Sequence, residues 1–503
     1  MTIETELKLR LPPSKNAAFR RLMATHAAEG SQAESEHLVS IYYDTPDLAL
    51  AQRDMGLRLR QVGGQWIQTL KMAEQAGAGL HQRPELEVVV AGPNLELDKI
   101  NGRKVQRFLS QDINAAELMP LFTTDIKRTR WMVQDTRGNT MEVCLDHGSV
   151  HGREQALKLN EVEIELKQGE TQAIFELALK LVNSLSLIPD PQSKAERGYS
   201  LYRDTPLLAP CKAQLPALHR KLSPEQALRM VVQETLRHLQ ANVPGILAHN
   251  DMECVHQARV ALRRLRSAQK AFDSVQLDEE WDVITTKVHW LATLLGEVRD
   301  LDVFLVETLP AIEPALAGHT DFAPLKAAMI ERRERCRREA HTALTSPRYG
   351  ALLLHLLAWL NRPAVTAPAK PTKLDDFAHR SLNRRWRPVV RLARQWEQLN
   401  QEQRHDLRKR AKKLRYSAEF FSPLYPRKPV RRYVERLQAL QQILGEMNDG
   451  VAAQALLAEF ARETPALEHA VGLIAGWLAH VAQQSETKLA SALKKLERTP
   501  AFW

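Results

Sequence analysis

The sequence lacks the features that would indicate a membrane-spanning or secreted protein. Its 503 residues include only four cysteines, with no C-x-x-C pair, so there is neither a disulfide framework nor a zinc-binding pattern. The longest nearly apolar run, residues 351–360, is interrupted by His355 and is too short to span a bilayer. The first ten residues alternate charged and apolar side chains, so no secretory leader is visible. These absences predict a reduced, cytoplasmic protein.

Aromatic residues are also scarce, and positive charge is unevenly distributed. Aromatics make up 6% of the chain, which argues against nucleic-acid binding by base stacking. Residues 1–210 contain 25 Lys and Arg against 28 Asp and Glu, whereas residues 211–503 contain 45 against 32. The second region is therefore strongly basic and is predicted to attract a polyanion.

Periodicity divides the chain into two regions and a linker. Residues 1–203 alternate as strands do, 204–222 contain prolines typical of a linker, and 223–503 show helical spacing. The predicted strands are Thr2–Leu11, Gly56–Val62, Gln65–Met72, Glu85–Val90, Ile126–Val133, Thr140–Leu145 and Asn160–Lys167. Helices are predicted between them at Ser14–Ala28, Asp98–Leu109 and Thr171–Leu187.

The helical region repeats itself. His256, Arg259, Arg263 and Arg266 correspond to His405, Arg408, Lys412 and Arg415 at a constant offset of 149 residues. The same offset relates Gly296-Glu297 and Asp300 to Gly445-Glu446 and Asp449. A constant offset predicts an internal duplication, with two similar helical bundles at about 223–361 and 373–503.

The predicted strands carry charged residues two positions apart, which places them on one face of each strand. Such sets are Glu4 and Glu6, Arg58 and Arg60, Arg128 and Arg130, and Glu161, Glu163 and Glu165. A solvated face with cross-strand ion pairs would explain any one strand. Several such strands together weaken that explanation, and if the sheet closes into a barrel, these faces point inward and form a charged interior. Carboxylates suit Mg²⁺ or Mn²⁺, and Arg and Lys suit phosphate oxygens, so the pattern favours metal-dependent phosphoryl or nucleotidyl chemistry.

These motifs carry a family resemblance. Glu4-Thr5-Glu6-Leu7-Lys8 is similar to the ExExK signature of the CYTH superfamily, also called triphosphate tunnel metalloenzymes. The other motifs follow in the family's order: Arg58-x-Arg60, Lys71, Glu85-x-Glu87, Arg128-x-Arg130, Asp146, Glu163-x-Glu165 and Ser193-Lys194-x-x-Arg197. The resemblance covers residues 1–203 and implies an α+β domain built on an eight-stranded antiparallel barrel that acts on triphosphates.

The resemblance also implies roles for individual residues. It assigns the divalent metal to Glu4, Glu6, Asp146, Glu163 and Glu165. It assigns the triphosphate to Lys8, Arg58, Arg60, Lys71, Arg128, Arg130 and Lys194, which form the catalytic set with Glu4 and Glu6. Glu85, Glu87, Glu161 and Arg197 are predicted to assist.

The two basic helices carry a second resemblance. His256, Arg259, Arg263 and Arg266 share one helix face, and His405, Arg408, Lys412 and Arg415 repeat that face. A solvated face would explain one such helix, but the repetition favours a binding surface. The segment HDLRKRAKKLRY, residues 405–416, resembles the signature of the CHAD domain, an all-α domain, and HQARVALRRLRSA is a looser match without the tyrosine. The resemblance covers about residues 220–500 and implies that these eight residues bind inorganic polyphosphate.

The prediction is therefore a metal-dependent inorganic triphosphatase that cleaves tripolyphosphate to pyrophosphate and phosphate, joined to a polyphosphate-binding domain. The alternatives are an adenylate cyclase or thiamine-triphosphatase of the same superfamily, and a non-catalytic polyphosphate-binding protein. Nucleic-acid binding by the basic half is the weakest reading, because no stacking motif interleaves the arginines.

Overall fold

A computed structural model describes residues 2–28, 32–72, 79–100, 113, 115–203, 208–273, 275, 279–316, 318–363 and 372–503. The chain forms two compact units. Unit 1 contains residues 1–209 and 345–362, and unit 2 contains residues 210–344 and 363–503. Each unit is described by itself below.

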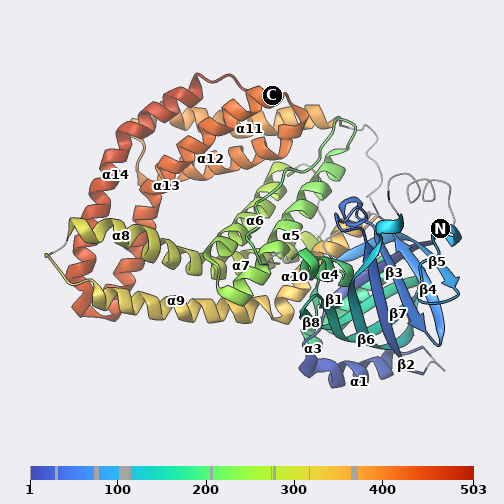
Figure 1. Ribbon diagram of the computed structural model, residues 1–503. Helices are drawn as coiled ribbons and strands as arrows, with labels where there is room; N and C mark the ends of the chain where they lie inside the picture. Colours follow the sequence, from blue (N-terminus) through green and yellow to red (C-terminus); the bar gives the residue numbers. More distant parts are fainter. Residues whose placement is uncertain are drawn as a thin grey trace. The chain divides into compact units, whose positions relative to one another are not determined.

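Unit 1 is built on a closed antiparallel barrel (Figure 1). Its eight strands are β1 (Thr2–Arg10), β2 (Glu34–Asp44), β3 (Gly56–Val62), β4 (Gln65–Lys71), β5 (Leu80–Val90), β6 (Met119–Gln134), β7 (Thr140–Gly152) and β8 (Gln155–Gln168). They pair in the order β5-β4-β3-β2-β6-β7-β8-β1, and β1 also pairs with β5, which closes the sheet. A two-residue strand, β9 (Ile188–Pro189), adds to β1. The predicted barrel is confirmed.

The apolar faces of these strands turn outward against helices and loops, which leaves the charged faces inside. Leu7, Leu57 and Leu59 are fully buried although they lie on the outer face. The covering helices are α1 (Asn16–His26), α3 (Gln172–Leu185) and α10 (Pro347–Asn361), whereas α4 (Lys194–Arg203) packs against the inner faces. The rings of Phe19 in α1 and Trp131 in β6 meet edge to face at 5.7 Å. Part of the hydrophobic core of unit 1 therefore surrounds the barrel, and a second cluster that includes Phe122, Ile126 and Tyr199 lies on the inner faces beside the charged residues.

Helix α10 belongs to unit 1 although it follows the first repeat of the helical region in sequence. It packs against α3 and β9. A Cβ atom on Gly350 would lie 2.0 Å from the carbonyl oxygen of Leu187, so only glycine permits this close approach. The sequence-based division places this segment with the helical domain, whereas the structure groups it with the barrel. The predicted boundaries at 203 and 223 stay a prediction.

Unit 2 is helical and repeats one arrangement twice. The first copy contains α5 (Pro224–His249), α6 (Met252–Ala271), α7 (Glu279–Val303), the short α8 (Leu309–Ile312) and α9 (Ala323–Leu344). The second contains α11 (Leu374–Arg394), α12 (Gln401–Phe421), α13 (Arg427–Glu463) and α14 (Glu468–Glu497). Helices α6 and α12 pack against each other, where Phe272 and Phe421 have ring centroids 5.1 Å apart. The two predicted bundles are thus present.

The remaining short turns connect these elements. They are η1 (Pro13–Lys15), η2 (Ala51–Arg53), η3 (Leu97–Lys99), η4 (Ala115–Glu117), η5 (Phe304–Thr308, a π-helical turn), η6 (Glu313–Ala315), η7 (Trp396–Gln398), η8 (Ser422–Leu424) and η9 (Pro465–Leu467). Most of the predicted helix at Asp98–Leu109 lies outside the described residues.

Candidate functional site

The barrel encloses a cavity of about 230 Å³ that is lined mainly by charged side chains. The lining residues are Glu4, Glu6, Lys8, Tyr42, Arg58, Arg60, Lys71, Arg83, Glu85, Glu87, Arg128, Glu163, Glu165, Lys167, Ser193, Lys194 and Ala195. Eight of these side chains are cationic and six are carboxylates. The lining therefore favours an anionic ligand while keeping enough carboxylates to hold a cation.

Strand register brings the carboxylates of β1 and β8 together. Glu6 lies directly opposite Glu165, and Lys8 lies opposite Glu163. In the closed strand order β3 is four strands away from β8 in either direction, so Arg58 and Arg60 of β3 face the β8 carboxylates across the interior. The cavity thus has a carboxylate wall and an arginine wall.

A cluster of three carboxylates lies at the deepest part of this wall. Oxygens of Asp146, Glu161 and Glu163 all lie within 4.8 Å of one another. The ammonium group of Lys194 lies 2.7, 2.5 and 2.9 Å from these three side chains, respectively. Arg128 donates two hydrogen bonds to Asp146, at 2.7 and 2.6 Å, and another to Glu163. Asp146 is fully buried, so this cluster depends entirely on side-chain cations for its charge balance.

Helix α4 places Lys194 there because Gly198 allows it to approach the barrel closely. A Cβ atom on Gly198 would lie 2.1 Å from the ring of Phe122 in β6. Lys194 is the first residue of α4, and its neighbour Ser193 also lines the cavity. The helix N-terminus therefore faces the interior, where its dipole also favours an anion.

Burial and mutual attraction shift the pKa values of this cluster. Burial disfavours the charged form of Glu163, but Lys194, Lys8 and Arg128 outweigh it and hold its pKa well below the ordinary value. Burial likewise opposes the charge on Lys8, yet Glu163 and Glu6 raise the pKa of Lys8 above its ordinary value. Glu161 differs, because burial raises its pKa despite Lys194. The cluster is thus a set of fixed ion pairs around one carboxylate that ionises less readily.

The other carboxylates of the cavity are also paired. Glu4 and Glu85 both contact Lys71, at 2.5 and 3.4 Å. Arg58 contacts Glu85 at 3.3 Å and Glu87 at 3.6 Å. Glu6 lies 2.8 Å from Lys8. A triphosphate could replace the carboxylates as the partner of the Lys and Arg side chains, because it is negatively charged. A divalent cation could replace the Lys and Arg side chains as the partner of the carboxylates, because it is positively charged.

Four predicted residues are not among the lining residues. Arg130 shares the inward face of Arg128, but it lies at the rim of the barrel, where it pairs with the exposed Glu34 at the start of β2. Arg197 pairs with Asp190 at 2.6 Å. Asp146 and Glu161 lie behind the lining: both contact the lining residue Lys194, and Asp146 also contacts the lining residue Arg128.

Sequence reasoning missed Tyr42 and Lys167. Tyr42 belongs to β2, which was not predicted as a strand. Its ring stacks on Phe122 with centroids 4.6 Å apart, and Arg58 donates a hydrogen bond to its hydroxyl. Burial raises the pKa of Tyr42, but Arg58, Arg60 and Lys194 outweigh burial and lower it. Lys167 could have been found by continuing the alternation 161, 163, 165 by one step.

In unit 2, residues of both copies line a basic cavity of about 360 Å³. His256, Arg259, Arg263, Arg299, Asp300, Val303, Phe304, Thr308, Arg408, Lys412, Ala453 and Leu456 line it. Five of the eight residues predicted to bind polyphosphate are among them. The duplication brings Arg259 and Arg263 of α6 together with their counterparts Arg408 and Lys412 of α12.

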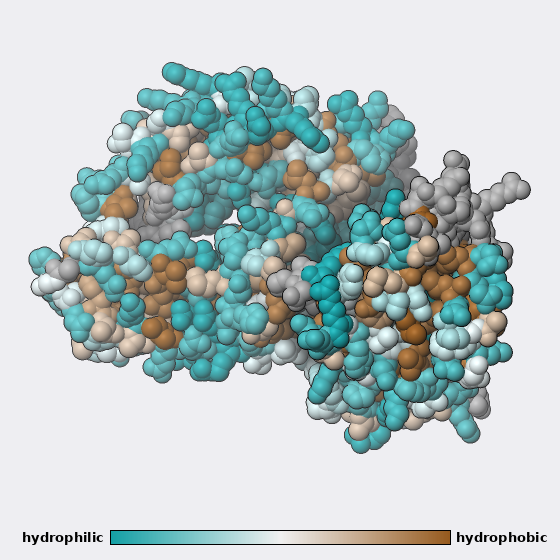
Figure 2. Space-filling model, viewed as in Figure 1, coloured by the Kyte–Doolittle hydropathy of each residue, from teal (hydrophilic) through white to brown (hydrophobic). Residues whose placement is uncertain are grey.

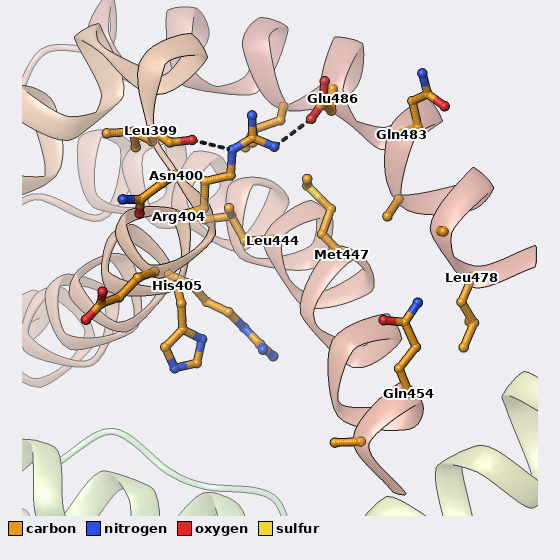
Figure 3. A pocket seen from close by; sticks show the side chains of 16 residues that line it. Leu399, Asn400, Arg404, His405, Leu444, Met447, Gln454, Leu478, Gln483 and Glu486 are labelled. Carbon is orange, nitrogen blue, oxygen red and sulfur yellow. Dashed lines mark hydrogen bonds and ion pairs between the residues drawn. The ribbon is translucent and has the colours of Figure 1, made fainter. Parts of the chain in front are cut away.

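The other three predicted residues lie elsewhere. His405 lines another, mainly apolar cavity of about 1200 Å³ between α12, α13 and α14 (Figure 3), which shares Arg408 with the basic cavity. There Arg404 donates to the carbonyl of Leu399 at 3.0 Å and pairs with Glu486 at 2.5 Å. Arg415 lies 3.5 Å from Glu419, and Arg266 is exposed outside the lining of the basic cavity.

A closed barrel with a charged interior and a duplicated helical unit with a basic cavity define a two-domain class of protein. A family model of the CYTH domain matches residues 2–199, and a model of the CHAD domain matches residues 230–458. The chain belongs to the proteins that carry a CYTH domain followed by a CHAD domain. This confirms both resemblances.

Individual relatives agree with this architecture. An inorganic triphosphatase of Haemophilus influenzae is 31% identical over 202 residues, which are 40% of this chain and 55% of that protein. The chain thus matches about 55% of the length of this relative. An uncharacterized protein of Mycobacterium tuberculosis is 26% identical over 93% of this chain and 91% of its own length. The crystal structure of the CHAD domain from the plant Ricinus communis is 32% identical, with a TM-score of 0.53, and covers 59% of this chain and 99% of its own.

Among the described residues, no helix combines the length and apolar character needed to cross a membrane.

Proposed function

We propose that the barrel is a metal-dependent inorganic triphosphatase that hydrolyses tripolyphosphate to pyrophosphate and orthophosphate. The observation that carries this proposal is the pair of opposed walls in one closed cavity, with Glu6, Glu163 and Glu165 facing Arg58 and Arg60. The triphosphatase relative supports the same reaction class. That the barrel of this chain acts on tripolyphosphate and uses a metal stays a proposal.

The cationic residues would bind the phosphate chain. Arg58 and Arg60 each present a planar fork of donors that can hold two phosphate oxygens. Lys71 supplies a point charge from the neighbouring strand β4, Lys8 supplies one from β1, and Arg128 lies beside the carboxylate cluster. The reaction breaks the bond between the terminal phosphorus and the bridging oxygen, and a water oxygen forms the new bond. The arginine wall stabilises charge on the transferred phosphoryl group and on the departing pyrophosphate.

The donor set fits a hard divalent cation such as Mg²⁺ or Mn²⁺, because only carboxylate oxygens converge here. Glu4, Glu6, Glu163 and Glu165 line the cavity and would hold it. Asp146 is fully buried and already engaged by Arg128 and Lys194, so its proposed role is to position those two cations. When bound, the cation would neutralise phosphate charge and lower the pKa of a coordinated water.

One substrate panel tests this proposal. Purified full-length protein is assayed for phosphate release from tripolyphosphate, ATP, thiamine triphosphate and long-chain polyphosphate, with Mg²⁺ and with Mn²⁺. We expect tripolyphosphate to be cleaved fastest and chelator to abolish cleavage. Faster turnover of ATP to a cyclic product, or of thiamine triphosphate, would replace the proposal with the corresponding alternative. No release from any substrate would favour a non-catalytic binding protein.

We also propose that the helical unit binds inorganic polyphosphate in its basic cavity. Arg259, Arg263, Arg408 and Lys412 line it from both copies of the repeat, and phosphate oxygens need no base-specific contacts. Charge reversal at both Arg259 and Arg408 should weaken polyphosphate binding and spare tripolyphosphate hydrolysis. Equal loss of both activities would contradict separate sites. A cytoplasmic location stays a prediction.

A further inference from the structure

Helix α11 carries a row of exposed arginines that lies outside the basic cavity. The row consists of Arg380, Arg384, Arg387, Arg391 and Arg394, all exposed. Their spacings of four, three, four and three residues place them on one face of the helix. At 1.5 Å of rise per residue the row extends for about 21 Å.

Most of this positive charge is not balanced locally. Arg384 pairs with Asp273, and Arg394 pairs with Glu497 at 2.8 Å. Within the part of the chain that the structure describes, Arg380, Arg387 and Arg391 have no carboxylate at ion-pair distance. The acidic residues of α11 lie in its first turn, before the row begins.

The corresponding helix of the first copy is different. In α5, Arg229 pairs with Glu225 at 2.9 Å and Arg237 pairs with Glu234 at 2.8 Å. The arginines of α5 are thus neutralised by carboxylates on the same helix. At the repeat offset of 149 residues the row aligns with five buried residues of α5, namely Val231, Thr235, His238, Asn242 and Gly245. The row is therefore a property of the second copy, not of the repeated fold.

Packing does not require most of the row. Helix α11 buries the opposite face through Ala378, Leu382, Val389 and Ala393. Like charges three and four residues apart repel each other and destabilise an isolated helix. Arg380, Arg387 and Arg391 add this repulsion and gain no ion pair among the described residues, which points to a ligand.

We infer that this row, Arg380 to Arg394, is a second contact surface for long-chain inorganic polyphosphate, which rests on the proposed polyphosphate binding by unit 2. A single file of cations matches a linear polyanion whose charges also lie in a single file. None of the exposed large hydrophobic side chains lies on α11, so the row offers no group that would insert into a bilayer or stack on bases. Figure 2 shows a predominantly hydrophilic surface over the part of the molecule that carries α11.

This surface makes binding depend on chain length. Tripolyphosphate is too short to bridge a row of about 21 Å, whereas a long polymer can contact several arginines at once. A chain held at two places on one protein gains affinity from effective concentration without any new type of contact. The row should therefore affect long polyphosphate and leave tripolyphosphate unaffected.

The test uses the full-length protein with R380Q/R387Q/R391Q. We expect about tenfold weaker binding of long-chain polyphosphate at 0.1 M salt and a shallower salt dependence, with unchanged tripolyphosphate hydrolysis. The matched control is R21Q/R335Q/R338Q, which removes three exposed arginines that do not form a row. The control should bind long-chain polyphosphate as the parent protein does.

Three results would overturn the inference. The row variant could bind polyphosphate with unchanged affinity, or the control could lose as much polyphosphate affinity as the row variant. The row variant could also lose affinity for duplex DNA or anionic vesicles alone and keep its affinity for polyphosphate. The R259E/R408E variant separates this inference from the proposed function. If R259E/R408E loses polyphosphate binding while the row variant keeps it, only the inference about α11 fails. If R259E/R408E binds normally, the proposed cavity fails.

Discussion

The two units hold their charged residues in opposite ways. In the barrel, charges point inward and pair at short range, as Lys194 does with Asp146, Glu161 and Glu163. The basic cavity of the helical unit is lined by one carboxylate, Asp300, against five Arg and Lys side chains, and Arg259 lies 3.6 Å from that carboxylate. Buried pairs are sensitive to geometry, because an unpaired charge there is costly. Solvated cations act through a field that salt screens.

This difference predicts that single substitutions in the barrel strongly change its activity or stability, whereas single substitutions in the helical unit change its binding only weakly. The predictions below test this contrast, beginning with the largest expected effect.

The Glu6→Gln substitution should reduce tripolyphosphate turnover by about a thousandfold or more. The change removes a negative oxygen from the wall that is proposed to hold the metal, while the side chain keeps its size. The protein should stay folded with only a modest fall in Tm, because Lys8 loses one carboxylate partner and keeps Glu163. Glu34→Gln is the control, because Glu34 lies at the rim and is 65% exposed. Near-normal activity in Glu6→Gln would refute the assigned role.

The Lys194→Ala substitution should destabilise unit 1 by about 3–5 kcal/mol, because three buried carboxylates lose a shared cation. Mn²⁺ should restore part of the lost stability, since these oxygens lie within 4.8 Å of one another and suit a divalent ion. Denaturant unfolding with and without metal measures both effects. Lys167→Ala, at a 38% exposed side chain, should cost less than about 1 kcal/mol. An equal, metal-independent effect in both variants would contradict this account.

Metal affinity should fall as the pH falls. Protonation of Glu165 should contribute to this loss at a higher pH than protonation of an ordinary glutamate would. Burial raises the pKa of Glu165 despite Lys167, so Glu165 takes up a proton at a higher pH than an ordinary glutamate does. A protonated carboxyl group is a poor metal ligand. The metal concentration for half-maximal activity should rise at acidic pH in the parent protein and rise less in Glu165→Gln. Identical pH profiles would exclude Glu165 from the metal site.

The smallest expected effect is a difference in salt dependence between polyphosphate binding and tripolyphosphate hydrolysis. Raising salt from about 50 to 200 mM should weaken polyphosphate binding by about tenfold or more. The KM for tripolyphosphate should change less, because buried pairs are screened less than exposed ones. Parallel titrations of binding and hydrolysis measure the contrast. Equal salt slopes would mean that both sites are similarly exposed to solvent.

Much of the barrel could be predicted because side-chain direction in a strand is a local property. Glu4, Glu6, Glu163 and Glu165 point inward as alternation requires. Arg130 obeys the same alternation, but its distance from the centre depends on where β6 leaves the barrel. Strand β2 was missed, and its register against β6 is irregular near Tyr42. Period-2 alternation cannot reveal such an irregularity.

In the helical unit the duplication was visible in sequence, but the composition of its cavity was not. The repeat makes His256 and His405 equivalent, yet only His256 lines the basic cavity. Helix α10 was assigned to the helical region because an apolar helix has the same sequence pattern whichever domain it packs against. Its packing beside α3 depends on Gly350, where a Cβ atom would clash with the carbonyl oxygen of Leu187.

The sequence by itself determined the class of this protein: the charged inward faces, the repeat offset of 149 residues and the basic second half all follow from local spacing. Only the tertiary structure decided that Lys194 balances the three buried carboxylates, that Tyr42 joins the cavity, and that α10 packs with the barrel. These contacts join residues far apart in the chain, and the spacing of neighbouring residues carries no information about them.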